Sequence, residues 1–483
     1  MEDKNQLIKM LVEKGVFVEE DVISLLDSED NLQTLRANMD RVVSMATLNK
    51  EGLCQLRRKP EPRAPTHPVK VIFSYDTESD KRDIQDFVSY FRARYRALQG
   101  ILMSRPELKS AISINRILQR DEKDSVTCIG MVTEIKETKN HNLILTLEDL
   151  SGEIKVLINK NKPDLIEGGR NLVTDEVIGI VGKNDGSIIF ANSIVWPDVP
   201  YGLERKRSPD ECYAIFLSDL HVGSNNFLPD RLDKLLSWLH GEAGTEEQKR
   251  IAQLTKYIFI AGDLVDGVGI FPDQDKELVI KDIYCQYREC ARFLAKIPSD
   301  KHIIICPGNH DAMRIAEPQP ALYRDFAQAI YDLPNVTLTS NPAFVNIHAS
   351  QGFPGFDVLL YHGYSFDYFV ANVDSIRTSG GYDRADLTMK YLLQRRHLAP
   401  AHTSTLYIPD SQRDPLVIDR IPDFFISGHI HKVAVSNYRN ITLICGSCWQ
   451  AKTAFQERVG HNPEPCVAPL VNLQTRQVKL LRF

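Results

Sequence analysis

The sequence predicts a multidomain α/β (α+β) chain in which a small β-barrel precedes a sandwich of sheets covered by helices. Three observations support this prediction. β-type runs cluster between residues 125 and 196, strands alternate with helices after residue 211, and short apolar runs in the second half end in polar clusters.

The first part of the chain is expected to hold three segments. Residues 1–50 place apolar side chains at helical spacing and predict a small helical module. Prolines with no packed apolar pattern predict a linker over 51–75. Residues 76–120 are expected to form a helical connector, whose main element is an amphipathic helix over 84–103.

Five β-type runs separated by turn residues predict a barrel domain over 121–200. A more polar insert over 159–170 follows the third run, which is typical of an OB-type barrel. A barrel used only for packing is the alternative. The runs hold no row of aromatic side chains of the kind that stacks nucleic-acid bases.

Composition excludes several classes of protein. The 483 residues are 43% hydrophobic and 25% charged, as in soluble globular proteins. No apolar run is long enough to span a membrane, and no signal-peptide stretch follows Met1, so a cytoplasmic location is expected. The net charge is −6, whereas proteins that bind duplex DNA alone are usually basic. Any nucleic-acid binding surface is therefore expected to be small or to belong to a partner.

Polar clusters in the second half of the chain predict a site for two metal ions. Most of them follow short apolar runs that predict buried strands, and loops at strand ends can bring them together. The runs are Tyr213–Leu217, Tyr257–Ala261, His302–Cys306, Val358–Tyr361 and Phe424–Ile426. The clusters are Asp219-Leu-His221, Gly262-Asp263, Gly308-Asn309-His310-Asp311, His362-Gly363 and Gly428-His429-Ile430-His431. Each cluster alone is a weak signal, whereas the ordered set indicates one site.

The residue types in these clusters favour phosphoester hydrolysis. A pair of metal ions needs one shared carboxylate, and Asp263 suits that position because Gly262 lets the backbone approach closely. Imidazole mixed with carboxylate oxygen suits Mn, Fe, Zn or Ni. His310 is expected to protonate the leaving oxygen, and Asp311 to orient its imidazole. The predicted metal ligands are Asp219, His221, Asp263, Asn309, His362, His429 and His431.

This ordered set resembles the calcineurin-like metallophosphoesterase superfamily, and the corresponding domain is expected over 208–483. The resemblance implies that His310 is the catalytic histidine. It also implies one ion held by Asp219, His221, Asp263 and His431, and a second held by Asp263, Asn309, His362 and His429.

A closer resemblance covers nearly the whole chain. The order of module, linker, OB-type barrel and phosphoesterase is similar to small (exonuclease) subunits of archaeal family-D DNA polymerase, as are phrases such as Tyr361-His-Gly-Tyr-Ser-Phe-Asp367. This implies a manganese-dependent, nucleoid-associated 3′→5′ exonuclease that proofreads single-stranded 3′ ends of DNA. Its partners would be the large catalytic subunit and a sliding clamp, and no membrane is implied.

Two other functions remain open at this point. One is a stand-alone phosphomonoesterase or cyclic-nucleotide phosphodiesterase that uses the same metals on small substrates. The other is a non-catalytic scaffold subunit of a polymerase. Arg395 and Arg396 are interpreted as a solvated helix face, with contact to a phosphate backbone as the alternative.

Overall fold

We describe a computed structural model of the chain. It divides into two compact units, Met1–Ala64 and Pro65–Phe483. The structure describes residues 2–14, 16–26, 28, 31, 35, 42, 47–48, 69–77, 81–120, 124–458 and 460–483. Within these ranges, no helix is long and apolar enough to cross a lipid bilayer.

The N-terminal unit contains the predicted helices and a short strand pair that the sequence did not predict. The helices bury apolar side chains, among them Leu11 and Val22, in a core of their own. Leu48 of the strand pair joins this core. The described elements are α1 (Glu2–Glu13), β1 (Phe17–Val18), α2 (Glu20–Leu25) and β2 (Thr47–Leu48), in which β1 and β2 pair in parallel.

The predicted barrel is present as a closed sheet of five strands in the order β4-β5-β6-β8-β7. Alternate side chains such as Leu145, Val156 and Ile180 fill its interior. The strands are β4 (Ser125–Glu137), β5 (Leu143–Asp149), β6 (Gly152–Ile158), β7 (Val177–Asn184) and β8 (Ile188–Val195). The polar insert after the third strand forms α8 (Pro163–Arg170), and α7 (Ile114–Leu118) packs against β6.

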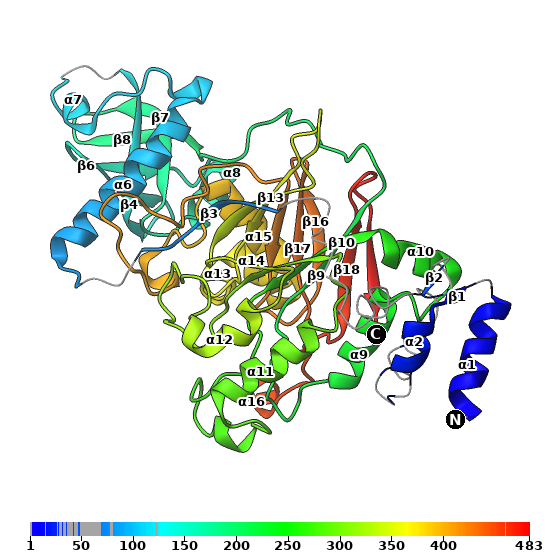
Figure 1. Cartoon of the computed structure of the whole chain (residues 1–483). Helices are drawn as coiled ribbons and strands as arrows, with labels where there is room; N and C mark the ends of the chain where they lie inside the picture. The colour runs from blue at the N-terminus through cyan, green and yellow to red at the C-terminus, as the bar shows by residue number, and fades with distance from the viewer. Residues whose placement is uncertain are drawn as a thin grey trace. The chain divides into compact units, whose positions relative to one another are not determined.

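Two six-stranded sheets form the centre of the C-terminal region (Figure 1). The first has the order β12-β11-β10-β9-β18-β19, in which β9 to β12 are parallel. The second has the order β16-β17-β15-β14-β13-β3. The first sheet contains β9 (Tyr213–Leu217), β10 (Thr255–Ala261), β11 (His302–Cys306), β12 (Val336–Leu338), β18 (Val467–Asn472) and β19 (Val478–Arg482). The second contains β3 (Lys70–Ser74), β13 (Ala343–Ile347), β14 (Phe356–Leu360), β15 (Phe424–Ser427), β16 (Ala434–Tyr438) and β17 (Ile441–Cys445).

Three apolar cores hold this sandwich together. Phe216 and Phe259 from the first sheet meet Phe356 and Phe424 from the second in the core between the sheets. Helices then cover the outer face of each sheet. Those on the first sheet are α9 (Pro229–Leu239), α10 (Glu246–Leu254), α11 (Ile283–Leu294) and α12 (Arg324–Tyr331). Those on the second are α13 (Phe366–Asn372), α14 (Asp374–Thr378) and α15 (Ala385–Arg395). This confirms the predicted fold class.

The helical connector packs on the sandwich through buried polar contacts. Its main helix, α6 (Ile84–Met103), has the predicted bounds and begins at the capping residue Asp83. Arg94 donates from Nε to Oδ2 of Asp414 over 2.6 Å, and the Tyr90 hydroxyl donates to Oδ1 over 2.8 Å. Both pairs are buried, so α6 has a defined position on the sandwich.

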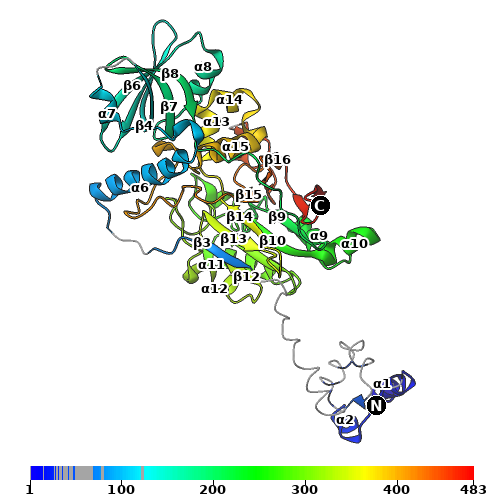
Figure 2. The ribbon, with the colours of Figure 1, turned by 90° about the horizontal axis from the view of Figure 1, so that it is seen from above.

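The barrel contacts the sandwich through α15. Tyr391 donates from its hydroxyl to Glu176 of the barrel over 2.7 Å, and Arg395 pairs with the same carboxylate over 3.3 Å. Figure 2 shows α8 and the barrel strands beside α13 to α15. The prediction that Arg395 and Arg396 form a solvated face is wrong, because both are buried; Arg396 donates to the backbone oxygens of residues 418 and 419.

One boundary also needs correction. The predicted linker over 51–75 extends too far, because Lys70–Ser74 form β3 and pair with β13 at the edge of the second sheet. Val71, Ile72 and Phe73 are apolar, but the run is short and closely follows the prolines. Residues 51–68 lie outside the described residues.

Candidate metal centre

All seven predicted ligands lie in loops that leave the ends of buried strands. Asp219 and Asp263 lie two residues beyond β9 and β10, and Asn309 lies three beyond β11. His362 and His429 follow β14 and β15 of the second sheet in the same way. Because these strand ends lie along one edge of the sandwich, the loops from both sheets meet there.

Most of these residues have a backbone conformation that side chains other than glycine rarely adopt. Asp219, His221 and Asp263 have φ of 52°, His431 has 57° and His429 has 69°. Such left-handed conformations cost free energy and persist only where the surrounding structure enforces them. The loops therefore turn sharply directly after the strands and direct polar side chains toward a common region.

Two glycines make room for this convergence. At Gly262 φ is 86°, and a Cβ atom would overlap the imidazole of His362. At Gly308 a Cβ atom would overlap the carboxylate of Asp263. Larger residues at either position would push these two side chains apart.

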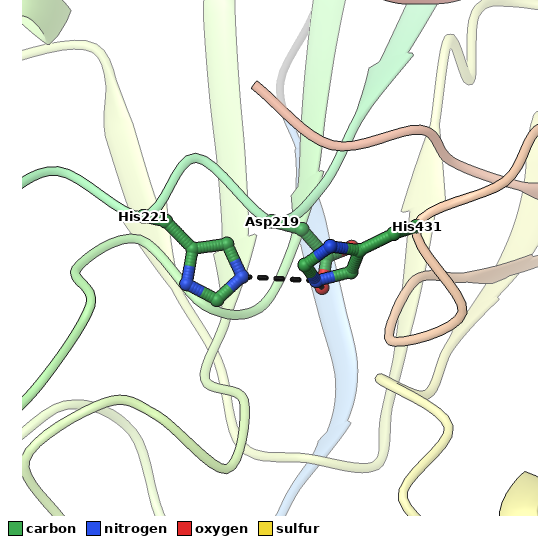
Figure 3. A group of neighbouring side chains, drawn as sticks. All are labelled: Asp219, His221 and His431. Atoms are coloured by element: carbon green, nitrogen blue, oxygen red, sulfur yellow. Dashed lines mark hydrogen bonds and ion pairs between the residues drawn. The ribbon is translucent and has the colours of Figure 1, made fainter. Parts of the chain in front are cut away.

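Asp219, His221 and His431 form one candidate metal-binding group, whose ligand atoms all lie within 4.8 Å of one another. Nε2 of His221 lies 3.0 Å from Nε2 of His431, and Nε2 of His431 lies 3.4 Å from Oδ1 of Asp219 (Figure 3). The two imidazoles thus present the same nitrogen to one point. That arrangement suits ligands of a shared cation.

Asp263, His362 and His429 form a second such group. Nε2 of His362 lies 3.2 Å from Oδ2 of Asp263 and 3.0 Å from Oδ1 of Asn309, which brings the amide into the same group. The same Oδ2 lies 4.0 Å from Nε2 of His221 in the first group. Asp263 therefore faces both groups, as a shared ligand would.

Each of the four histidines has its second ring nitrogen held by a neighbour. Nδ1 of His221 pairs with the Asp266 carboxylate, and Nδ1 of His362 donates to the carbonyl oxygen of Ala261. Nε2 of His429 lies 3.0 Å from Oδ2 of Asp367. Nδ1 of His431 contacts the amide of Gln456. Such partners orient imidazoles and select the tautomer that binds a metal.

These supporting residues were not predicted from the sequence. Asp367 ends the sequence segment Tyr361–Asp367. It lies in the first turn of α13, and this position places its carboxylate beside His429. Asp266 follows Asp263 by three residues and also lies next to His310. A carboxylate close to a predicted ligand in the sequence is the only signal that could have indicated either role.

His310 lies beside the metal groups, and its imidazole is held by a backbone contact. Nδ1 donates to the carbonyl oxygen of Asp266 over 2.8 Å, and the His310 amide donates to Oδ1 of Asp263 over 2.8 Å. The ring of His310 stands edge-on to that of His221 at 4.7 Å. Burial lowers the pKa of His310, although Asp263 acts in the opposite direction.

The role expected for Asp311 needs correction. Its Oδ2 accepts from the backbone amide of Gly308 over 2.9 Å, and its Oδ1 accepts from the Tyr287 hydroxyl over 3.2 Å. Burial raises the pKa of Asp311 to about 7, and the nearby charge of Asp263 adds to this effect. Asp311 thus supports the loop that carries Asn309 and His310, while Asp266 supplies the contact that orients His310.

The donor set fits divalent cations. Asp219 and Asp263 are 0% and 1% exposed, and among the described residues their ion pairs are with imidazoles. Burial acts against charge on Asp263, yet the imidazoles of His362 and His310 hold its pKa well below its ordinary value. Buried carboxylates surrounded by imidazoles are typical ligands of transition-metal ions.

A cavity of about 310 Å³ opens onto these groups. His310 and the predicted ligands Asp263, Asn309 and His429 line it, together with His461. Asp219 and His362 are fully buried and lie behind the lining. The cavity is large enough for a phosphate group and part of its ester.

Comparison with known proteins assigns the family. The model of the calcineurin-like phosphoesterase family matches residues 214–433. The chain is 38% identical to the DNA polymerase II small subunit of Methanothermobacter thermautotrophicus over 86% of this chain and 84% of that protein. It is 37% identical to the protein of the same name from Archaeoglobus fulgidus over 85% of this chain and 80% of that one.

The protein of the same name from Pyrococcus furiosus is also 37% identical, over 83% of this chain. This chain spans only 64% of that longer relative. The chain belongs to the family of DNA polymerase II small subunits and contains a calcineurin-like phosphoesterase domain.

Proposed function

We propose that this chain is the proofreading 3′→5′ exonuclease subunit of a heterodimeric replicative DNA polymerase. The observation that carries the proposal is the complete ligand set around Oδ2 of Asp263, in which His362 and His221 approach the same oxygen atom. A scaffold without activity would have no need to keep every ligand and the contact that holds each imidazole.

The residues that would hold the ions follow from the two groups. Asp219, His221, Asp263 and His431 would hold one divalent ion, and Asp263, Asn309, His362 and His429 the other. Mn²⁺ suits this mixed set, and Fe, Zn or Ni would also fit. When bound, such ions lower the pKa of a water molecule and withdraw charge from a phosphate.

His310 would act on the leaving group. Its Nδ1 proton is committed to the carbonyl oxygen of Asp266, which leaves Nε2 to exchange a proton with the substrate. Hydrolysis adds water at the phosphorus of the terminal nucleotide and breaks its bond to the preceding 3′ oxygen. Transfer of a proton to that oxygen gives a shortened strand with a 3′ hydroxyl and a nucleoside 5′-monophosphate.

The partners follow from the family. Its members carry the name of a small subunit, so we propose a large catalytic subunit of the polymerase as the partner of this chain. The net charge of this chain is −6, which disfavours extensive contacts with DNA phosphates. We therefore propose that the large subunit makes most of the contacts with duplex DNA. Single-stranded 3′ ends would be the substrate, and a sliding clamp a further partner.

The test uses the full chain with Mn²⁺ and a single-stranded oligonucleotide labelled at its 5′ end. We expect a ladder shortened from the 3′ end and release of nucleoside 5′-monophosphates, both lost in His310→Ala and Asp263→Ala. A blocked 3′ end should prevent digestion. Hydrolysis of small esters alone would instead support a stand-alone phosphodiesterase, and DNA digestion unaffected by Asp263→Ala would mean that this site does not cause it.

A further inference from the structure

A second cavity, of about 660 Å³, adjoins the metal cavity. The two share Tyr364 and Asp367 as lining residues. Phe87, Tyr368 and His402 also line it, so rings from three separate parts of the chain meet there. We call this cavity the aromatic trough.

We propose that the aromatic trough binds the bases that precede the 3′-terminal nucleotide of single-stranded DNA, and that it does so by stacking. This inference rests on the proposed exonuclease function and adds the residues that select a single strand. Stacking suits such an enzyme because every base has a π-face, so that any sequence can be digested.

His402 is held in place although its side chain is exposed. Its ring stacks on Tyr407 at a centroid distance of 5.3 Å and an interplanar angle of 28°. Phe91 and Phe87 of α6 flank the same ring at 5.8 and 6.4 Å. Tyr407 is itself buried and donates from its hydroxyl to the backbone oxygen of Ala401 over 2.9 Å. An exposed ring on a rigid support loses little conformational entropy when a base stacks on it.

The trough leads directly to the metal ligands. The ring of Tyr364 lies 5.8 Å from that of His429 at an angle of 65°. Asp367, the other shared residue, pairs with Nε2 of His429. Because the two cavities share these residues, a strand whose scissile phosphate lies at the metal groups can continue into the trough.

The lining of the trough favours bases over other occupants. Beside the rings, Thr403 and Leu406 are exposed lining residues, whereas no Lys or Arg belongs to the described lining. A trough for the phosphate backbone would need cations, whereas aromatic rings suit nucleobases. Duplex DNA would not fit, because its bases are already stacked on one another.

The first test compares two substrates of the full chain with Mn²⁺. One is an oligothymidylate, and the other is bis(4-nitrophenyl) phosphate, a diester that reports on the metal site without a strand. We expect His402→Ala and Tyr368→Ala to lower kcat/KM for the oligonucleotide relative to the small diester by roughly five- to hundredfold, mainly through KM. His402→Ala keeps the contact of the backbone amide of residue 402 with the Asp175 carboxylate.

Two further sets of variants separate stacking from a structural effect. His402→Phe and Tyr368→Phe should restore most of the lost efficiency, because each retains a flat ring. Tyr201→Ala is the matched control, since Tyr201 is an aromatic residue that is 80% exposed and packs on Arg439 outside the trough. The proposal is overturned if the two alanine variants behave like Tyr201→Ala.

The second test asks whether the trough contacts bases. An oligonucleotide with abasic residues at the second to fourth positions from its 3′ end should be a weaker substrate for the wild type by the same factor. The double variant Tyr368→Ala, His402→Ala should no longer distinguish abasic from intact strands. If it distinguishes them as the wild type does, the bases bind elsewhere.

A cross-linking measurement gives a readout that does not depend on turnover. Oligonucleotides with 5-iododeoxyuridine at these positions should form photo-cross-links to peptides that contain Phe87, Tyr368 or His402, and cross-links confined to other peptides would contradict the proposal.

The metal-site proposal and the trough proposal can be disproved independently. If the small diester is not hydrolysed, or is hydrolysed equally by Asp263→Ala, the metal-site proposal fails. If its hydrolysis depends on Asp263 but the trough variants have no effect, only the trough is disproved.

Discussion

The carboxylate atom Oδ2 of Asp263 lies 3.2 Å from Nε2 of His362. The same oxygen also approaches His221, so one buried atom lies between the two candidate metal groups. Asp263→Asn keeps the shape of the side chain and removes its charge. We expect manganese binding to fall below two ions per chain and hydrolysis to fall by more than roughly a hundredfold. Calorimetric titration with Mn²⁺ measures the first effect, and Asp300→Asn, at an exposed acid, is the control.

Asp367 should tune the metal site without binding an ion itself. Its Oδ2 lies 3.0 Å from Nε2 of His429 and fixes the orientation of that imidazole. We expect Asp367→Ala to weaken manganese affinity or activity by roughly 10- to 100-fold, and Asp367→Asn to have a smaller effect. A manganese titration of activity separates a change in affinity from a change in the maximal rate. An Asp367→Ala variant with wild-type manganese dependence would contradict this role.

His310 should matter most when the leaving group is poor. His310→Ala should lower kcat on DNA by roughly 10²- to 10⁴-fold while manganese binding stays the same, because His310 is not among the predicted ligands. A nitrophenyl ester of thymidine 5′-phosphate has a leaving group that needs no proton. The loss with this substrate should therefore be much smaller. Equal losses on both substrates would mean that His310 acts through the phosphate and not through proton transfer.

Acid should destabilise the contact between α6 and the sandwich through His397. Nε2 of His397 donates to Asp414 over 2.8 Å, and burial, with the charge of Arg94 adding to it, lowers the pKa of His397 to about 4. An unfolded histidine titrates near 6.5, so the unfolded state takes up its proton first as the pH falls. The free energy of unfolding should then lose about 3 kcal/mol between pH 6.5 and 4.

The pH dependence of the free energy of unfolding should be compared with that of His397→Gln. Glutamine can still donate a hydrogen bond to Asp414 but does not titrate. Chemical unfolding at several pH values should give a shallower dependence between pH 6.5 and 4 in the variant than in the wild type. The Asp414 carboxylate contributes separately, because Arg94 and His397 lower its pKa against the effect of burial. Its contribution is lost only below its ordinary pKa of ~3.8, outside the histidine window. Identical pH profiles would contradict the role of His397.

Arg395 should be essential for the attachment of the barrel. It is buried, pairs with Glu176 and donates to the backbone oxygen of Asn171 in the barrel. Arg395→Ala leaves the Glu176 carboxylate buried without its cation and should cost ~3–5 kcal/mol of stability. Arg170→Ala breaks an exposed pair with Glu137 and should cost less than ~1 kcal/mol. Equal effects of the two variants in denaturant unfolding would disprove this assignment.

The strands of the metal centre were predictable because burial on both faces leaves a continuous apolar run. β11 has the predicted bounds, and β10 ends at the predicted Ala261. The positions of predicted ligands that follow such strands directly, such as Asp263 and His362, could therefore be predicted from the sequence. The strand β3 could not be predicted in this way. It lies at the edge of its sheet, and an edge strand can be short and need not be apolar on both faces.

Side-chain partners were much less predictable. The contact between Asp367 and His429 joins residues 62 positions apart, and Arg395 meets Glu176 across 219 positions. Helical spacing places Arg395 and Arg396 on a helix end but cannot show that a barrel covers that end. The neighbouring position of Asp311 suggested a contact with His310, whereas a sharp turn directs its carboxylate to Gly308 and Tyr287.

The most direct test of the account is anomalous diffraction from crystals of the full chain soaked in Mn²⁺. Two manganese peaks are expected in the cavity lined by His310, both within bonding distance of Oδ2 of Asp263. One peak should also contact His431 and the other His362. A single peak, or two peaks with no shared oxygen of Asp263, would contradict it.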